Sequence, residues 1–386
     1  MKIVLLYDFL LVEGGLERVM VTQSKWLSKK HTVTASFATI DPTLKPFFPA
    51  HVTVAEHDTI FRNGTLKIMF TFLNLASLNK YRDANLFISH SFICTRLAYY
   101  MKKHFGIPYV VYLHHPPNFL YWKGKKKEWS NDLGRKIAML TGILLGPWLR
   151  KNDKKVVRAA DLTFVNSAYT QRRIQKIYGI KPTIIYPTLS PKFVLKEPKE
   201  TSYILKKFNL NSYLICAGRL IPDKKYDWLI RAFSVIQNKT IPLVIVGKIK
   251  EDYKQELISL ARQLNCQERI KFLGFVSDED LVALYSNARA FAFPAPEEDF
   301  GLVPIEAMAC GTPVVAWDDK AGPSETVLPE INGYLAQPYN FNDFAHKIDL
   351  VLQKKFPRTR VASTIKKFKE EEQMNLFVKE LEKIKH

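Results

Sequence analysis

Short apolar runs alternate with amphipathic stretches along the whole chain, and this alternation constrains the fold more than any other feature. The apolar runs are 3–7, 31–38, 85–89, 109–113 and 162–166 in the first half, and 213–218, 242–247, 269–274, 289–294 and 313–317 in the second. Helical periodicity lies between them, at 15–29, 93–105, 167–178, 225–236, 252–264, 278–287 and 303–310. Short, uniformly apolar runs predict parallel strands whose sheet is covered by helices on both faces. We therefore expect two doubly wound α/β domains.

The stretch YPTLSPKFVLKEPKETS (186–202) is rich in Pro and Lys and has no periodicity, which predicts an interdomain linker. The predicted domains are 1–190 and 191–360, and a length of 386 residues suits two domains. The tail, 361–386, is predicted to be a charged helix that is a candidate to pack back on the N-terminal domain. Its apolar face would be formed by Phe368, Met374, Phe377 and Leu381.

The four cysteines (Cys94, Cys216, Cys266 and Cys310) are far apart and include no CxxC pair. This spacing indicates a reducing compartment and argues against a disulfide framework or a structural zinc site. The first apolar run is broken by Asp8, which predicts a buried strand rather than a signal peptide. No run approaches the roughly 18 apolar residues that a membrane-spanning helix needs. We expect a chain on the cytoplasmic side, soluble or bound at the membrane surface.

The net charge of +20 is concentrated in the first half, where residues 1–190 hold 28 Lys and Arg against 11 Asp and Glu. Segment 123–158 is the most basic part, with the uncharged run 137–149 inside it and Trp122, Trp129 and Trp148 nearby. The run 66–82 is similar. Such segments suit helices lying in a membrane interface against anionic head groups. Two alternatives stay open: core helices of the first domain, or a nucleic-acid surface, although no nucleic-acid-reading motif is present.

The stretch EEDFGLVPIEAMACGTPVVA (297–316) carries two acids at the start of a predicted helix. Pro294 and Pro296 keep Glu298 on a loop, whereas Glu306 lies about one turn inside the helix. Backbone N–H groups at such a helix N-terminus form an anion site suited to phosphate. Carboxylates beside that site can bind hydroxyl groups. A phosphate flanked by hydroxyl-binding acids describes a nucleotide-sugar.

This stretch resembles the Glu-x7-Glu signature of family-4 retaining glycosyltransferases, which have the GT-B fold of two Rossmann-like domains facing across a cleft. Four further segments follow in family order, and the resemblance covers nearly the whole chain: GGLERV (14–19), GRLIPDKKYDWLIRAF (218–233), FLGFVSDEDLVALYSNA (272–288) and AGPSETV (321–327). The segments DFGLVPIEA, GPSETV and LHHPPNFLYW (113–122) most resemble mannosyltransferases of bacterial polysaccharide and lipid-linked oligosaccharide assembly.

The resemblance implies a role for each matching residue. The implied donor-diphosphate residues are Gly15, Arg219, Lys224, Gly301 and Leu302. Donor sugar and ribose contacts are implied for Phe300 and Glu306, and an acceptor-loop role for Gly14. The implied catalytic residues are His114, with His115 as the alternative, and Glu298, which would hold the sugar's distal hydroxyls.

Three positions stay open. Lys225 stands where the family usually has glycine, so either Lys224 or Lys225 could reach the phosphate. Glu325 could face the donor or cap a helix. Asp318 and Asp319 could suggest a metal pair, but the resemblance implies a metal-independent enzyme without a cofactor.

The implied reaction transfers a hexose with retention, namely mannose from GDP-mannose, to a polyprenyl-diphosphate-linked or polysaccharide-precursor acceptor at the inner membrane face. Catalysis would rest on positioning and on stabilising the leaving diphosphate. The alternatives are a UDP-sugar donor, a basic nucleic-acid-binding protein, an epimerase or phosphorylase on the same fold, and a partner-binding pseudoenzyme. Intact acidic and basic site residues argue against the last, and no nucleic-acid partner is expected.

Overall fold

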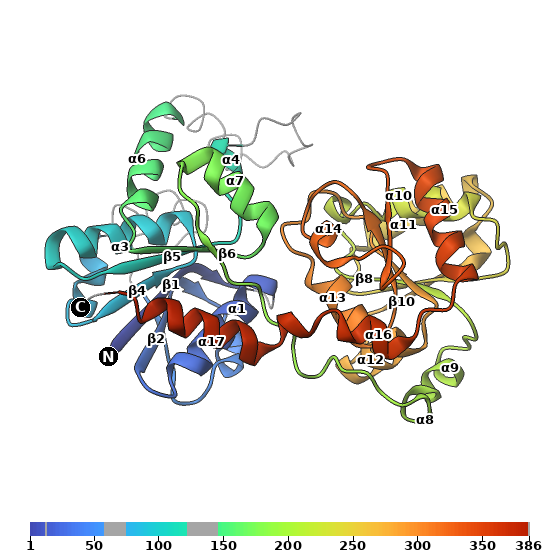
Figure 1. The fold of residues 1–386 in the computed structure, drawn as a ribbon, viewed down its shortest axis with the longest axis horizontal. Coiled ribbons are helices and arrows are strands. Elements are labelled where there is room, and N and C mark those ends of the chain that lie inside the picture. The colour runs from blue at the N-terminus through green and yellow to red at the C-terminus, as the bar shows by residue number, and fades with distance from the viewer. Residues whose placement is uncertain (12–13, 58–74, 122–145, 385–386) are drawn as a thin grey trace. The chain divides into compact units, whose positions relative to one another are not determined.

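The structure is a computed structural model that describes residues 1–11, 14–57, 75–121 and 146–384. The chain forms two compact units (Figure 1). Unit 1 comprises Met1–Pro187 and Glu371–His386, and unit 2 comprises Thr188–Glu370. This division lies close to the boundary expected at residue 190.

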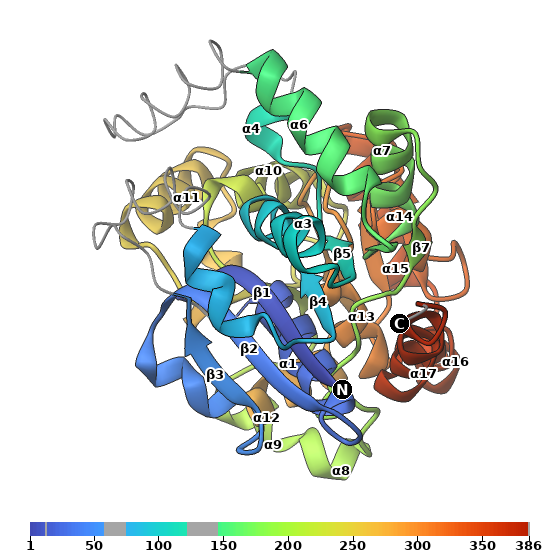
Figure 2. The same ribbon diagram turned by 90° about the vertical axis from the view of Figure 1, so that its left-hand side faces the viewer.

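Unit 1 is built on a seven-stranded parallel sheet in the order β3-β2-β1-β4-β5-β6-β7 (Figure 2). Its strands are β1 (Lys2–Leu10), β2 (Thr32–Ile40), β3 (Thr53–Glu56), β4 (Leu86–Ser89), β5 (Tyr109–Leu113), β6 (Leu162–Val165) and β7 (Thr183–Ile184). Its helices are α1 (Gly15–Leu27), α3 (Phe92–Phe105), α4 (Asn118–Tyr121), α6 (Gly146–Arg158), α7 (Ala168–Tyr178) and α17 (Glu370–Leu381), with 3-10 turns η1 (Pro42–Phe47) and η3 (Leu75–Tyr81).

Alternate residues of β1 enter two different cores, one on each face of the sheet. Ile3 and Leu5 pack with α1 and α17, whereas Val4 and Leu6 pack with α3, α6 and α7. The run is apolar throughout because both faces are covered, as expected for a parallel strand. The sheet thus confirms the predicted doubly wound architecture.

The tail helix α17 lies in the core of unit 1, where Met374, Phe377 and Leu381 are buried. The prediction that Phe368 shares this face is wrong. Phe368 ends a separate 3-10 turn, η6 (Lys366–Phe368), and α17 begins only at Glu370. Phe368 packs instead in unit 2, with its ring centroid 5.4 Å from that of Phe300.

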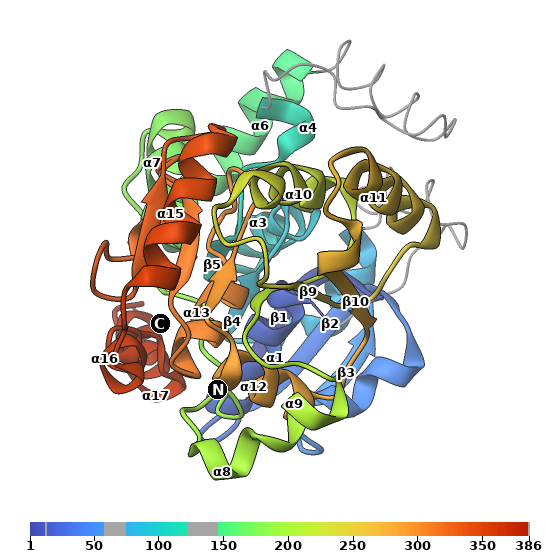
Figure 3. The ribbon, with the colours of Figure 1, turned by 90° about the vertical axis from the view of Figure 1, so that its right-hand side faces the viewer.

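Unit 2 has a six-stranded parallel sheet in the order β10-β9-β8-β11-β12-β13 (Figure 3). The strands are β8 (Leu214–Ala217), β9 (Leu243–Val246), β10 (Ile270–Gly274), β11 (Ala290–Ala292), β12 (Val314–Trp317) and β13 (Gly333–Ala336). The helices are α8 (Pro198–Thr201), α9 (Tyr203–Lys207), α10 (Tyr226–Val235), α11 (Glu251–Gln263), α12 (Asp278–Asn287), α13 (Leu302–Ala309), α14 (Pro323–Thr326), α15 (Phe341–Gln353) and α16 (Arg358–Ser363), with 3-10 turns η4 (Pro222–Lys224) and η5 (Gln267–Arg269). Helix α8 lies inside the stretch that was expected to be an irregular linker.

In each unit the strand order changes direction once, between β1 and β4 in unit 1 and between β8 and β11 in unit 2. Ligands of open parallel sheets bind at such switch points, outside the carboxyl ends of the strands. The sites below lie at these two places. Within the described residues, no helix is long and apolar enough to cross a membrane.

Candidate functional site

The loop 294–301 of unit 2 is held in place by hydrogen bonds from residues at and just after the end of β12. The indole N–H of Trp317 donates to the carbonyl of Pro294 at 2.7 Å, and the backbone N–H of Glu297 donates to Asp319 at 2.7 Å. Asp319 also accepts from the N–H of Ala321 at 3.1 Å. Burial raises the pKa of Asp319. Asp319 therefore holds this loop in place through its hydrogen bonds, a role that was not predicted from the sequence.

Asp318 points elsewhere, because it pairs with Lys320 at 2.8 Å. The two acids of the Asp318-Asp319 pair thus have different partners. Within the described ranges, no group of three or more His, Cys, Asp or Glu side chains is placed to hold a metal ion.

The turn 321–323 packs directly on the same loop. The N–H of Gly322 donates to the carbonyl of Glu298 at 2.8 Å. A Cβ atom at Gly322 would lie only 2.3 Å from the backbone of Phe300, so only glycine fits here. Gly301 is the N-cap of α13 with φ of +87°, a left-handed conformation that glycine adopts at little cost. These contacts fix the direction in which the N-terminus of α13 points.

Glu298 and Lys224 form an ion pair at 2.5 Å, with side chains 26% and 28% exposed. Lys224 ends the 3-10 turn η4 that follows β8, whereas Glu298 lies on the loop after β11. Arg219, also just after β8, is exposed, and its side chain makes no hydrogen bond or ion pair with any part of the chain that the structure describes. The switch point of unit 2 therefore brings Lys224 and Glu298 together on the loops that follow β8 and β11, and Glu298 lies just before Gly301, the N-cap of α13.

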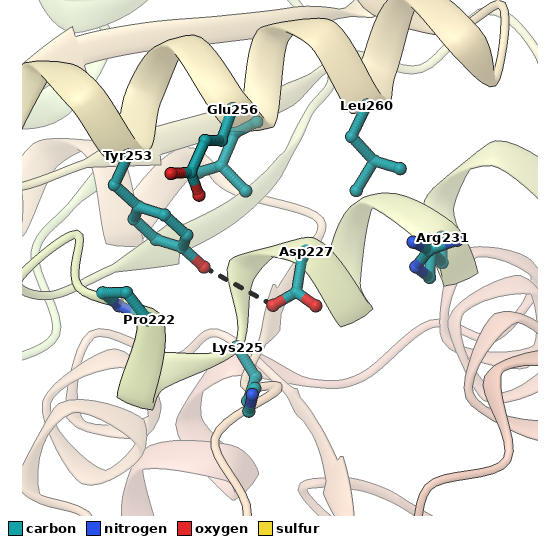
Figure 4. Close-up of a pocket in the computed structure, with 8 residues that line it drawn as sticks. Pro222, Lys225, Asp227, Arg231, Tyr253, Glu256 and Leu260 are labelled. Carbon is teal, nitrogen blue, oxygen red and sulfur yellow. Dashed lines mark hydrogen bonds between the residues drawn. The ribbon is translucent and has the colours of Figure 1, made fainter. Parts of the chain in front are cut away.

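Lys225 faces a different part of unit 2. Its φ of +54° is left-handed, which suits the glycine that the family usually carries here. Its ammonium lies 5.3 Å from the ring centroid of Trp228. It also lines a hollow of about 280 Å³ between α10 and α11, where Tyr253 donates to Asp227 at 3.4 Å (Figure 4). Of the two candidate lysines, Lys224 is the one that contacts Glu298.

The remaining predicted site residues of unit 2 are buried or partly buried. Glu306 is only 4% exposed inside α13, and its charge adds to burial in raising the pKa of Tyr285. Phe300 is also 4% exposed and packs on Phe368, so its side chain is part of the core of unit 2. Leu302 is the partly buried first residue of α13. Glu325 lies in the four-residue helix α14.

In unit 1, Gly14 is the N-cap of α1 with an extended φ of −134°, so its conformation does not require glycine. A Cβ atom there would lie 2.6 Å from a carboxylate oxygen of Glu17. The Glu17 side chain thus fills the space beside Gly14, in the first turn of α1, where a carboxylate interacts favourably with the helix dipole. Gly15 is the exposed first residue of the helix. The acceptor and diphosphate roles of these glycines stay predictions.

Asp8, near the carboxyl end of β1, was not predicted as a site residue. Its Oδ1 accepts from the Ser91 hydroxyl at 2.8 Å and from the Cys94 thiol at 3.3 Å. Burial raises the pKa of Asp8 to about 6, although these two hydrogen bonds oppose the shift. The only signal in the sequence was an acid that interrupts an apolar run.

His114, just after β5, is 8% exposed and its Nε2 lies 3.2 Å from Nδ1 of His90, just after β4. Burial lowers the pKa of His90 to about 3 and, with His90 and His115 nearby, lowers the pKa of His114 well below its usual range. His115 is exposed, and its Nδ1 lies 2.9 Å from the carbonyl of Pro116. No sequence pattern pointed to His90, which lies 24 residues earlier than His114.

Comparison with known families accounts for both units. The family described as glycosyl transferases group 1 matches residues 200–374, and glycosyltransferase family 4 matches residues 13–192. The O-antigen chain mannosyltransferase B of Escherichia coli is 28% identical over 240 residues, which cover 58% of this chain and 60% of that protein. A GDP-mannose-dependent monoacylated alpha-(1-6)-phosphatidylinositol monomannoside mannosyltransferase of Corynebacterium glutamicum is 30% identical over 198 residues, covering 47% and 51%.

The chain spans only 35% to 60% of the length of the first curated relatives that it matches. Among solved structures, HepE from Anabaena in complex with UDP superposes with a TM-score of 0.78 and 20% identity, over 100% of both chains. The matched regions, the motifs and the two parallel-sheet units agree. The chain belongs to family 4 of the glycosyltransferases and has the GT-B fold.

Proposed function

We propose that the chain is a retaining, metal-independent glycosyltransferase that moves mannose from GDP-mannose to a lipid-linked or polysaccharide-precursor acceptor at the inner face of the cytoplasmic membrane. The observation that carries this proposal is the meeting of Lys224 and Glu298 beside the N-terminus of α13. A nucleotide-sugar has a diphosphate for the cation and the helix N-terminus, and hydroxyl groups for the acid.

Each group then has a distinct task. Arg219, Lys224 and the N–H groups near Gly301 and Leu302 balance the charge that builds on the leaving diphosphate. Glu298 orients the transferred sugar and Glu306 the ribose. The acceptor hydroxyl attacks the face from which the diphosphate leaves, and a phosphate oxygen takes its proton.

Donor binding would also separate Lys224 from Glu298, because the same ammonium cannot serve both the carboxylate and the diphosphate. A partly exposed pair of this kind contributes little to stability. Breaking this ion pair therefore costs little free energy when the donor diphosphate replaces the carboxylate as the partner of Lys224.

The donor is tested by thermal unfolding in EDTA with GDP-mannose, GDP, UDP-glucose, UDP-N-acetylglucosamine or UDP. A ligand at 100 times its Kd stabilises the fold by about 3 kcal/mol. We expect a shift with GDP and GDP-mannose only, and a much smaller one in Lys224→Ala. A shift with uridine nucleotides alone would establish the UDP-sugar alternative, towards which the UDP-bound fold neighbour points. A shift that requires added Mg²⁺ would contradict metal independence.

The membrane part of the proposal rests on the surface formed by α3 and α6, which we call the α3–α6 surface. Trp148 is 54% exposed there, with the guanidinium of Arg96 5.6 Å from its ring. The ammonium of Lys155 lies 5.9 Å from the ring of Tyr99, and Lys151 is exposed. Exposed aromatic and basic side chains on one helix suit an anionic lipid surface.

Sedimentation with vesicles of phosphatidylglycerol and phosphatidylcholine tests this surface. The triple variant Trp148→Ala, Lys151→Glu, Lys155→Glu should lose most binding. The control Lys25→Glu, Lys30→Glu, on α1 and in the turn that follows it, changes the charge equally and should keep binding. Equal loss in both would show that only the overall charge matters. The basic residues Lys125, Lys126 and Lys127 and most of the apolar runs 66–82 and 137–149 lie outside the described residues.

A further inference from the structure

Two buried histidines touch at the carboxyl ends of neighbouring strands of unit 1. His90 is 3% exposed and His114 8% exposed, and Nδ1 of His90 lies 3.2 Å from Nε2 of His114. At this distance the two ring nitrogens form a hydrogen bond, in which the N–H group of one ring donates and the lone pair of the other accepts. The contact therefore ties the protonation of one ring to that of the other.

Packing holds both rings in place. The ring of Tyr112 stacks on His90 at 5.4 Å and lies 4.7 Å from His114. The Tyr112 hydroxyl donates to the carbonyl of Ile185 at 2.5 Å, which fixes that ring in turn. The histidines cannot turn away from each other without disturbing a fully buried tyrosine.

The two outer ring nitrogens differ. Nε2 of His90 is buried and has no hydrogen-bond partner among the residues that the structure describes. Nε2 of His114 is occupied by His90, so Nδ1 is the ring nitrogen of His114 that stays available to a ligand. We propose that His90 is a positioning residue that holds His114 by Nε2 and makes it present a protonated Nδ1 to the substrate. This inference rests on the proposed function for its catalytic meaning.

The site of the proton follows from the unpartnered nitrogen. If His114 donated to His90, the proton of neutral His90 would lie on its buried Nε2, as an N–H group without an acceptor. Buried N–H groups without partners are rare in proteins. In the opposite arrangement His90 donates from Nδ1 and keeps only a lone pair at Nε2. His114 then accepts at Nε2 and carries its own proton on Nδ1.

This arrangement limits what His114 can do. A neutral imidazole with N–H at Nδ1 donates a hydrogen bond to a substrate oxygen, such as a sugar hydroxyl, and does not remove a proton there. The lowered pKa of both rings keeps the pair neutral near pH 7. His114 would therefore orient the sugar without acting as a general base.

Long-range ¹⁵N–¹H NMR of the full chain, labelled at its nine histidines, reads the proton position directly. Signals are assigned from single His90→Asn and His114→Asn variants. We expect both His90 and His114 to be neutral near pH 7 with the proton on Nδ1. A proton on Nε2 of His114 would overturn the proposal.

Substitutions at His90 test the coupling. His90→Phe removes the donor, so His114 should change its tautomer, and kcat should fall about 10- to 100-fold with the donor KM nearly unchanged. His90→Asn places an amide near the Nδ1 position and should restore most of kcat. His57→Phe is the matched control, because His57 is also buried in unit 1 but contacts Ser36 instead.

An unchanged His114 tautomer in His90→Phe would overturn the positioning role. Equal losses of kcat in His90→Phe and His57→Phe would reduce that role to general packing. If the unmodified protein transfers no sugar from any donor, the proposed function fails, while the NMR result still decides the proton position.

Discussion

The two units place opposite kinds of groups at the ends of their strands. The half that contains most of unit 1 is strongly basic. Yet Asp8 near the end of β1, His90 just after β4 and His114 just after β5 have pKa shifts that all favour the neutral form. The other half is nearly balanced in charge, yet its strand ends carry the ion pair of Lys224 and Glu298. Burial, rather than the net charge of a unit, decides which charge a site presents. Unit 2 is therefore suited to an ionic ligand, and unit 1 to a neutral one.

The largest expected effect is that of Lys224→Ala in unit 2, which tests whether this unit binds an ionic ligand. If Lys224 balances the leaving diphosphate, its loss should lower kcat/KM about 100- to 1,000-fold. Lys225→Ala is the matched control, because Lys225 faces Trp228 and the hollow beside α10, and it should change kcat/KM by less than about threefold. Steady-state kinetics with the donor found by thermal unfolding provide the measurement. Equal effects of the two variants would remove Lys224 from the site.

A second test compares one glycine from each unit. In Gly322→Ala the new Cβ would meet backbone atoms of Phe300 at 2.3 Å, so the turn must move, and overpacking of this kind costs about 1–3 kcal/mol. In Gly14→Ala the Cβ meets the end of the flexible Glu17 side chain at 2.6 Å, which can turn away. That substitution should cost only about 0.5 kcal/mol. Urea unfolding measures both, and a costly Gly14→Ala would show that Glu17 is held in place.

The third test uses the buried acid of unit 1. The pKa of Asp8 rises from 3.8 to about 6, so the folded state favours its protonated form. This stabilisation is complete below pH 3.8 and is lost as the pH rises through about 6. Asp8 is partly exposed, which reduces the expected effect. Asp8→Asn should therefore raise the free energy of unfolding by about 2 kcal/mol more at pH 8 than at pH 4.

Urea titrations at the two pH values measure this difference. Exposed Asp83 is the control with the opposite sign, because its hydrogen bond with Lys2 lowers its pKa. Asp83→Asn should lose stability at the higher pH. A stabilisation by Asp8→Asn that does not depend on pH would contradict the buried-acid interpretation.

The sequence predicted most of both sheets because their central strands are continuous apolar runs. Among the strands that the structure describes, the three that the sequence did not predict are short: Thr53–Glu56, Thr183–Ile184 and Gly333–Ala336. Each lies at the edge of its sheet, where one side is unpaired and partly exposed, so the apolar signal is weak. Local composition does not show which strand becomes an edge.

The same limit applies to the sites. The loop around Glu298 could be predicted because the proline and glycine residues that shape it are its sequence neighbours. The contact of Asp8 with Ser91 spans 83 residues and exists because β1 lies beside β4, three strands later in the chain. The pairing of His90 with His114 likewise depends on β4 lying beside β5. These groups come together through strand order, which local patterns do not encode.

The smallest expected effect concerns the backbone of Lys225, the residue next to Lys224. Lys225 adopts a left-handed φ of +54°, a conformation that costs most residues about 1–2 kcal/mol more than glycine. Lys225→Gly and Lys225→Ala both remove the contact with Trp228, but only glycine relieves the backbone. Because glycine also gains entropy when unfolded, the glycine variant should exceed the alanine variant in stability by only about 1 kcal/mol. Neither change should affect turnover. A less stable glycine variant would mean that residue 225 does not hold this conformation in solution. The left-handed turn at Lys225, which directs the side chains of Lys224 and Lys225 apart, would then no longer support the proposal that Lys224 binds the phosphate.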